Sequence, residues 1–280
     1  MKKNRQKLFN IIRKVALVSS AVFGFILIIF IVLGCQNHRL ELVFLDVGQG
    51  DSTLIKTPDG QTVLIDGGPD NKVLRGLGKN LPFYRRSIDF MILSHYHDDH
   101  ITGLIEIIKR YQVRTLIYSG QDSDSLLISE LLRVVSQYKV ELKVLNGQAG
   151  LSFGPTCNLN LLNPTILGIK EDPNNSLVFR LDCDGRSFLL AGDNGSAAEK
   201  ALLTSGWPLE ADIFKASHHG SNTSNGAAFL EKINPRLIII SVGADNRFGH
   251  PGSFFLERAT ALDIPIKRTD IEGDVKIFAK

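Results

Sequence analysis

Three histidines and two aspartates fall within six residues at the end of an apolar run, in the segment His95-Tyr96-His97-Asp98-Asp99-His100. Imidazole nitrogens and carboxylate oxygens are the donors that bind zinc and similar transition metals. In an extended chain His95 and His97 point to the same side and can share one ion. We expect the chain to turn into a helix near Asp99, so that Asp99 and His100 face a second ion.

The alternative for this segment is a solvated polar loop with incidental histidines. The whole chain of 280 residues has only seven histidines, so finding three of them within six residues favours a metal site.

The elements that must position this segment are short strands interleaved with helices. Strand-like runs bounded by Asp-Gly turns begin near residues 41, 52, 61 and 88, and further strands follow in the second half of the chain. Helical patterns cover residues 100–110, 124–138, 196–205, 224–232 and 253–262. We therefore expect an α/β fold in which two stacked sheets are covered by helices, as one domain over residues 40–280.

The spacing of the candidate ligands resembles the H-x-H-x-D-H signature of the metallo-β-lactamase superfamily, which is matched by His95, His97, Asp99 and His100. The resemblance implies a four-layer αββα sandwich and a site for two divalent ions, zinc by preference and manganese as the alternative. It also implies a hydrolase that uses a metal-activated hydroxide, with Asp99 as a catalytic residue that helps to position the nucleophile.

Three further parts of the superfamily pattern fall far from this segment. Asp66 corresponds to a carboxylate that orients a metal ligand, although its local sequence fits a tight turn equally well. Asp193 corresponds to the carboxylate that bridges both ions, and the alternative is a helix N-cap. The last ligand is one of two adjacent histidines. We favour His218, with His219 contacting substrate or supporting the site, and the reverse assignment stays open.

One ligand of the superfamily has no counterpart. A further histidine is expected between His100 and Asp193, where the chain reads Glu171-Asp172-Pro173-Asn174-Asn175-Ser176. Water or Asn175 would then complete the first metal, which we expect to be held more weakly.

A narrower resemblance covers almost everything from residue 41 onward. The runs 44–51 (FLDVGQGD), 217–221 (SHHGS) and 241–251 (SVGADNRFGHP), with Arg268-Thr269-Asp270 and Gly273-Asp274, are similar to the extracellular hydrolase domain of the DNA-uptake (competence) protein ComEC. The resemblance implies supporting roles for Asp46 and Asp51, substrate contacts for Gln49, Asn246 and Arg247, and a catalytic hydrogen bond from His250. The local alternatives are a polar hairpin loop for residues 46–51, a structural role for His250, and a solvated loop charge for Arg247.

The N-terminal segment is of a different kind. A basic tail over residues 1–14 precedes residues 15–34, which carry no charge. A helix of twenty such residues spans roughly the 30 Å core of a bilayer. We therefore expect a single-pass membrane anchor with the hydrolase domain on the extracellular side. The alternative is a lipoprotein cleaved at Cys35, because Val32-Leu33-Gly34-Cys35 resembles a lipobox. One such segment cannot form a many-helix channel, so we expect a stand-alone, membrane-tethered relative.

Charge limits the choice of substrate. The chain has 32 Lys+Arg and 29 Asp+Glu, but six of the cations lie in the basic tail, which leaves 26 against 29 for the remainder. The folded domain therefore lacks the strongly basic character of most nucleic-acid binders. We interpret Cys157 and Cys183 as small buried residues, and a disulfide pair is the alternative.

We expect a phosphodiesterase, most specifically a nuclease with nucleic acid as its substrate. Hydrolysis of a smaller phosphoester such as a phosphocholine group, of a lactone or of a thioester is the alternative. A non-catalytic surface binding module is disfavoured by the complete metal motif, and no obligate protein partner is evident.

Overall fold

The computed structural model describes residues 2–34, 39–120, 125–145, 150–162 and 176–279. It separates into two compact units, residues 1–38 and residues 39–280. The first unit contains one helix, α1 (Lys2–Gly34), in which the basic tail and the apolar stretch are continuous.

The expected membrane-spanning segment over residues 15–34 is not supported. Within the residues that the structure describes, no helix is both long enough and apolar enough to cross a membrane. Cys35, the alternative attachment site, lies outside the described residues.

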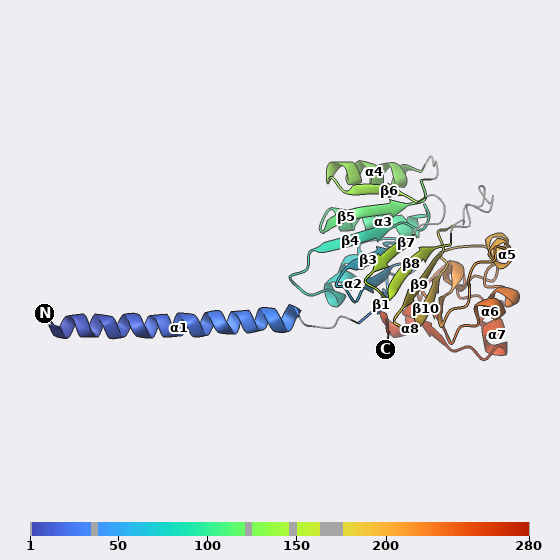
Figure 1. Ribbon diagram of the computed structural model, residues 1–280. Helices are drawn as coiled ribbons and strands as arrows, with labels where there is room; N and C mark the ends of the chain where they lie inside the picture. Colours follow the sequence, from blue (N-terminus) through green and yellow to red (C-terminus); the bar gives the residue numbers. More distant parts are fainter. Residues whose placement is uncertain (1, 35–38, 121–124, 146–149, 163–175, 280) are drawn as a thin grey trace. The chain divides into compact units, whose positions relative to one another are not determined.

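The second unit is built on two seven-stranded mixed sheets (Figure 1). The first sheet has the order β14-β1-β2-β3-β4-β5-β6, with β1 (Glu41–Phe44), β2 (Thr53–Lys56), β3 (Thr62–Ile65), β4 (Ser87–Ile92), β5 (Gln112–Tyr118), β6 (Glu141–Val144) and β14 (Val275–Phe278). The second has the order β13-β12-β11-β10-β9-β8-β7, with β7 (Gly150–Phe153), β8 (Cys157–Leu161), β9 (Phe179–Cys183), β10 (Arg186–Leu190), β11 (Ile213–Lys215), β12 (Leu237–Ile240) and β13 (Ile266–Arg268).

Helices lie against the outer face of each sheet (Figure 1). The first sheet is covered by α2 (Lys72–Asn80), α3 (Asp98–Ile108) and α4 (Leu126–Gln137). The second is covered by α5 (Ser196–Thr204), α6 (Ala227–Ile233) and α7 (Ser253–Ala261). A 3₁₀ turn, η2 (Ser217–Gly220), and a short helix, α8 (Thr269–Glu272), complete the described helical segments.

Strand periodicity explains the layers. Successive side chains of a strand point to opposite faces, so Val43 packs against the helices of the first sheet while Leu42 and Phe44 enter the space between the sheets. From the second sheet, Phe188 enters the same space while Leu189 packs against the helices on the other side. Three separate apolar cores therefore hold four layers together, as the expected αββα sandwich requires.

The two halves of the sandwich have matching strand directions. The strands from β3 to β6 run parallel to one another, and so do those from β10 to β13. Because carboxyl ends of parallel strands meet at one edge of a sheet, the loops that follow them collect there. Asp66, His95, Asp193 and His219 all follow such strands.

A disulfide joins Cys157 to Cys183. The two residues lie opposite each other on β8 and β9, with their Cα atoms 4.1 Å apart. Both side chains are buried between the sheets. Of the two interpretations of the cysteines, the structure has the disulfide.

Candidate metal centre

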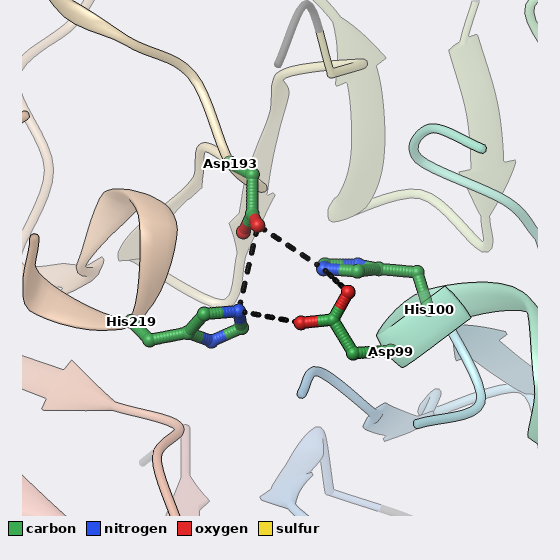
Figure 2. Close-up of side chains that lie close together, drawn as sticks. All are labelled: Asp99, His100, Asp193 and His219. Atoms are coloured by element: carbon green, nitrogen blue, oxygen red, sulfur yellow. Dashed lines mark hydrogen bonds and ion pairs between the residues drawn. The ribbon is translucent and has the colours of Figure 1, made fainter. Parts of the chain in front are cut away.

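Four side chains from three distant segments meet at the edge of the sandwich (Figure 2). Asp99 and His100 come from the first turn of α3, Asp193 follows β10, and His219 lies in the turn after β11. The Nε2 atom of His219 lies 3.1 Å from Asp99 Oδ2 and 3.4 Å from Asp193 Oδ2. The Nε2 atom of His100 lies 3.3 Å from the same oxygen of Asp193. These four residues can hold one cation.

A second group lies beside the first. His95, His97 and Asp193 place one ligand atom each within 4.8 Å of one another. His95 Nε2 is 3.8 Å from Asp193 Oδ2, and the rings of His95 and His97 are 4.5 Å apart between centroids. Asp193 belongs to both groups, so the arrangement offers two adjacent cation positions that share one carboxylate.

The donor atoms themselves support a metal site. His95 Nε2, His100 Nε2 and Asp193 Oδ1 are buried, and none of them has a hydrogen-bond partner among the described residues. A buried polar atom without a partner costs free energy, so such atoms are rare unless a ligand or ion satisfies them. Nitrogen and carboxylate donors at this spacing suit zinc, manganese or iron. The residues present therefore fit a pair of divalent ions.

Asp66 fixes the orientation of His100 from behind. Its Oδ2 accepts a hydrogen bond from His100 Nδ1 over 2.8 Å and another from the Ser94 hydroxyl over 2.7 Å, while its Oδ1 accepts from the Ser94 backbone N–H. With Nδ1 protonated, His100 turns its free Nε2 towards Asp193. The Ser94 hydroxyl also lies 3.1 Å from Nδ1 of His95, which assigns the same tautomer to that ring.

A matching arrangement supports His219. Its Nδ1 donates to the backbone carbonyl of Ser241 over 3.0 Å and lies 3.3 Å from Asp51 Oδ1. The other oxygen of Asp51 forms an ion pair with Lys215, and both side chains are almost fully buried. The buried ion pair of Lys215 with Asp51 thus contacts a candidate ligand histidine, and through this contact it affects the orientation and charge of the His219 ring.

Burial and charge act in opposite directions on the ionisable groups. Burial lowers the pKa of His100 and of His219, but neighbouring carboxylates together outweigh it and hold both values well above the ordinary one. These carboxylates are Asp193 and Asp66 for His100, and Asp193 and Asp51 for His219. Burial raises the pKa of Asp193, yet His219 and His100 bring it well below its usual range. The pKa of His95 is lowered well below the ordinary value, chiefly by burial. His95 is therefore a neutral ligand, whereas protons on His100 and His219 compete with metal ions.

Comparison with known proteins identifies the fold. Residues 45–127 match the Metallo-beta-lactamase superfamily. The crystal structure of the metallo-beta-lactamase fold protein YhfI from Bacillus subtilis aligns with a TM-score of 0.59 and 15% identity, over 85% of this chain and 99% of that one. The protein has the metallo-β-lactamase fold.

Two curated proteins are also similar in sequence. The chain is 25% identical over 277 residues to ComE operon protein 3 of Bacillus subtilis (strain 168), which covers 93% of this chain and 36% of that protein. It is 28% identical over 240 residues to competence protein ComA of Neisseria gonorrhoeae, covering 85% of this chain and 32% of that protein. The chain thus spans about a third of the length of these relatives.

The structure gives the two adjacent histidines different positions, and the favoured one, His218, is not in the described ligand groups. Of the two, the described ligand groups include His219 and not His218. The cause is the backbone, because His218 and His219 have φ values of 50° and 53° and Gly220 follows with 78°. Left-handed conformations are unfavourable for residues with a Cβ, and here they turn the His219 ring into the centre. The ring of His218 lies at the rim, 5.5 Å from that of His250.

The position of the missing histidine is only partly described. Asn175, the candidate substitute, lies outside the described residues. The next residue, Ser176, is buried, and its hydroxyl accepts a hydrogen bond from the backbone N–H of Asp193 over 2.8 Å. In this metallo-β-lactamase fold a serine therefore holds the backbone of the residue that carries the shared carboxylate.

The loop after β1 divides its polar residues between two tasks. Asp51 supports His219, as described above. Asp46 is exposed, and its Oδ1 accepts from the backbone of Gly48 over 3.2 Å, so it organises the loop and lies outside the ligand groups. Gln49 Oε1 accepts from the backbone N–H of Gly243 over 3.2 Å. A Cβ on Gly243 would lie 2.6 Å from the backbone of Gln49, so the close approach of these two loops requires glycine.

The loop after β12 brings His250 to the centre. Asn246 accepts from the backbone N–H of His250 over 2.9 Å and donates to the carbonyls of Gly243 and His250. Its amide is engaged within the loop, so Asn246 holds His250 in place and is not presented for a substrate contact. Arg247 is exposed, and its guanidinium lies over the ring of Phe248.

Ser94, Lys215 and Ser241 contribute to the site, although their roles do not follow from sequence motifs alone. Lys215 had a readable signal, because a lysine in the apolar run Ile213-Phe214-Lys215-Ala216 is costly unless it is paired. Ser241 acts through its backbone carbonyl, which gives no side-chain signal.

Proposed function

We propose that this protein is a metal-dependent hydrolase that cleaves phosphodiester bonds, with nucleic acid as its substrate class. The supporting observation is the pair of ligand groups that share Asp193, with buried donor atoms aimed into the space between them. The similarity to competence protein ComA is consistent with a nucleic-acid substrate.

A pair of divalent ions bound at such a centre would supply a lowered pKa for a water molecule and stabilisation of charge on the phosphodiester oxygens. The chain's own residues then have separate tasks. His95, His97, His100 and His219 would hold the ions, and Asp193 would offer its carboxylate to both positions. Asp99 retains 28% of its side-chain exposure, whereas the side chains of His100, Asp193 and His219 are at most 2% exposed. Asp99 is therefore better placed than His100, Asp193 or His219 to accept a proton near the substrate.

His250 has a different task. Burial, with the neighbouring His219 and His218, lowers its pKa to about 4. Its imidazole is therefore neutral at physiological pH, and its Nδ1 has no hydrogen-bond partner within the described residues. A neutral ring can donate one hydrogen bond to a phosphate or leaving oxygen, but it brings no positive charge. We assign it to substrate positioning and to assistance of the leaving group.

Hydrolysis of a small phosphoester is the second candidate. It is favoured by the charge of the domain, since the chain after the basic tail carries more acidic than basic residues. A short diester needs no extended basic surface. Turnover of bis-p-nitrophenyl phosphate without any cleavage of single-stranded or duplex DNA would select this candidate.

The test measures metal content and turnover on the same samples. The full chain and its Asp193→Ala and His97→Ala variants are assayed with DNA and with bis-p-nitrophenyl phosphate, and bound metals are counted by mass spectrometry. Asp98→Asn is the matched control, because Asp98 is an exposed carboxylate in the same motif outside the ligand groups. We expect both ligand variants to lose metal and turnover while the control keeps them. Unchanged turnover in both ligand variants would exclude the metal mechanism.

We also propose that the domain acts outside the cytoplasm. Disulfides persist mainly in oxidising compartments, and the Cys157–Cys183 pair supports such a location. Membrane attachment through the N-terminal segment stays a prediction of the sequence. Mass spectrometry of protein alkylated in its native host without a reductant tests the location. Free thiols at both positions would contradict it.

A further inference from the structure

An exposed aromatic ring stands beside the metal centre. Phe248 has 57% of its surface exposed. Its ring is stacked on that of His250, with 5.8 Å between centroids and 23° between planes. The His250 ring is in turn 6.2 Å from the ring of His219, which is a candidate ligand. Phe248 is thus connected to the centre through a single side chain.

The orientation of this ring is defined by its neighbours. The guanidinium of Arg247 lies over it, 5.1 Å from its centroid, and Asn246 holds the backbone of His250. The other large aromatic side chains exposed outside α1 in the described residues are Phe83, Tyr84, Tyr138, Phe254 and Phe278, and no described ring contact joins any of them to a histidine. Phe248 differs from them in being both open to solvent and held against the centre.

An exposed ring in a fixed orientation offers a surface for stacking. Nucleobases stack on aromatic side chains in every sequence context, because each base has a π-face, and arginine adds a cation–π contribution. A phosphodiester at the metal centre would place the group attached to it within reach of the rim. If that group is a nucleoside, its base meets an aromatic surface, whereas an alkyl group gains much less there.

We propose that Phe248 is a specificity-determining residue that stacks on the nucleobase next to the scissile phosphodiester, with Arg247 beside it for the adjoining phosphate. This inference rests on the proposed function and narrows it, because it distinguishes nucleotide diesters from alkyl diesters. The small net negative charge of the domain fits this arrangement, since stacking supplies affinity that an extended basic surface would otherwise supply.

The first test compares two chromogenic diesters, the p-nitrophenyl ester of thymidine 5′-monophosphate and ethyl p-nitrophenyl phosphate. Both release the same leaving group and differ only in the second arm. We expect the wild-type chain to prefer the thymidine ester in kcat/KM, and Phe248→Ala to reduce this preference by about tenfold through KM. Phe248→Tyr keeps the stacking surface and should retain the preference.

The matched control is Phe83→Ala. Phe83 is 88% exposed and precedes β4, whereas the metal-binding segment follows that strand. It should therefore leave the preference unchanged. Thermal unfolding of each variant shows whether a loss of preference comes from a loss of folding.

The second test has a readout other than turnover. Fluorescence anisotropy follows binding of a labelled oligothymidylate and of an abasic oligomer of equal length to the Asp99→Asn chain, with or without Phe248→Ala. We expect Phe248→Ala to weaken oligothymidylate binding about tenfold and to leave abasic binding unchanged. Equal losses of affinity for both oligomers, or a thymidine preference retained by Phe248→Ala, would overturn the stacking role of Phe248 and leave the proposed function intact. If the wild-type chain turns over neither these esters nor DNA, the proposed function itself fails, and this inference with it.

Discussion

The carboxylate of Asp66 accepts a hydrogen bond from Nδ1 of His100 over 2.8 Å, at a site where both side chains are buried. This contact joins the loop after β3 to the first turn of α3, and it decides which nitrogen of His100 faces the metal centre. Because the same carboxylate also accepts two hydrogen bonds from Ser94, one side chain sets the geometry of the whole His95–His100 segment.

Replacement of Asp66 by asparagine should weaken metal binding. The amide group would place a donor opposite the donors of His100 and Ser94, and would remove the charge that favours the Nδ1-protonated ring. Such changes behind a ligand typically reduce metal affinity by about 10–100-fold. Competition with a chromogenic zinc chelator measures the effect. Asparagine tolerates the positive φ of 62° at this position, so an affinity equal to that of the Asp98→Asn control would contradict the role of Asp66.

The two adjacent histidines should behave differently. We expect His219→Gln to reduce the metal content from about two ions per chain to about one, because it removes a ligand of the group that contains Asp99 and His100. His218→Gln should retain both ions, since the His218 ring lies at the rim. Elemental analysis after gel filtration distinguishes the two. Loss of metal from His218→Gln alone would restore the sequence-based preference.

The stability of the metal-free protein should depend on pH through His219. Its pKa in the folded state is raised well above 6.5, because Asp193 and Asp51 outweigh the lowering effect of burial. A histidine whose pKa is higher in the folded than in the unfolded state stabilises the folded protein. This contribution is complete below pH about 6.5 and is lost as the pH rises through the pKa of the folded state. In a chelating buffer, the unfolding midpoint should therefore fall as the pH rises above about 6.5.

Calorimetry over that pH range, with and without added zinc, measures this dependence. Zinc replaces the protons, so its stabilising effect should increase with pH. The His219→Gln variant serves as control and should show a shallower decline. A midpoint that rises with pH in the metal-free wild type would refute the assignment.

The buried ion pair of Lys215 with Asp51 should be costly to break. Lys215→Met leaves the Asp51 carboxylate buried without its cation, and removal of one partner of such a pair typically costs about 3–5 kcal/mol. Urea unfolding measures the loss. Lys267→Met is the matched control, because Lys267 forms an exposed ion pair with Glu272 over 2.8 Å, and loss of such a pair costs less than about 1 kcal/mol. Equal losses in both variants would show that Lys215 is not a special case.

The sequence predicted those parts of the protein that depend on local patterns. The run His95–His100 could be interpreted directly because its ligands are neighbours in the chain, and the helices from α3 to α7 lie close to the predicted ranges. Asp193 was assigned through the resemblance, because its neighbours in the sequence also fit a helix N-cap. The αββα layers followed from the alternation of strands and helices.

The remainder depended on three-dimensional details that leave no local pattern. The choice between His218 and His219 rests on the backbone dihedrals of a turn, which the letters His-His-Gly do not specify. The engagement of the Asn246 amide depends on where the chain returns at His250. The membrane-spanning segment was expected from composition alone and is not supported by the described helices.

The ligands of each proposed cation come from both sheets. His95 to His100 follow β4 of the first sheet, whereas Asp193 and His219 follow β10 and β11 of the second. A bound ion therefore ties the two halves of the sandwich together, and ligand binding to the folded state alone stabilises it by mass action. Starvation for metal would remove this contribution to stability, and the protein would then be more easily unfolded and degraded.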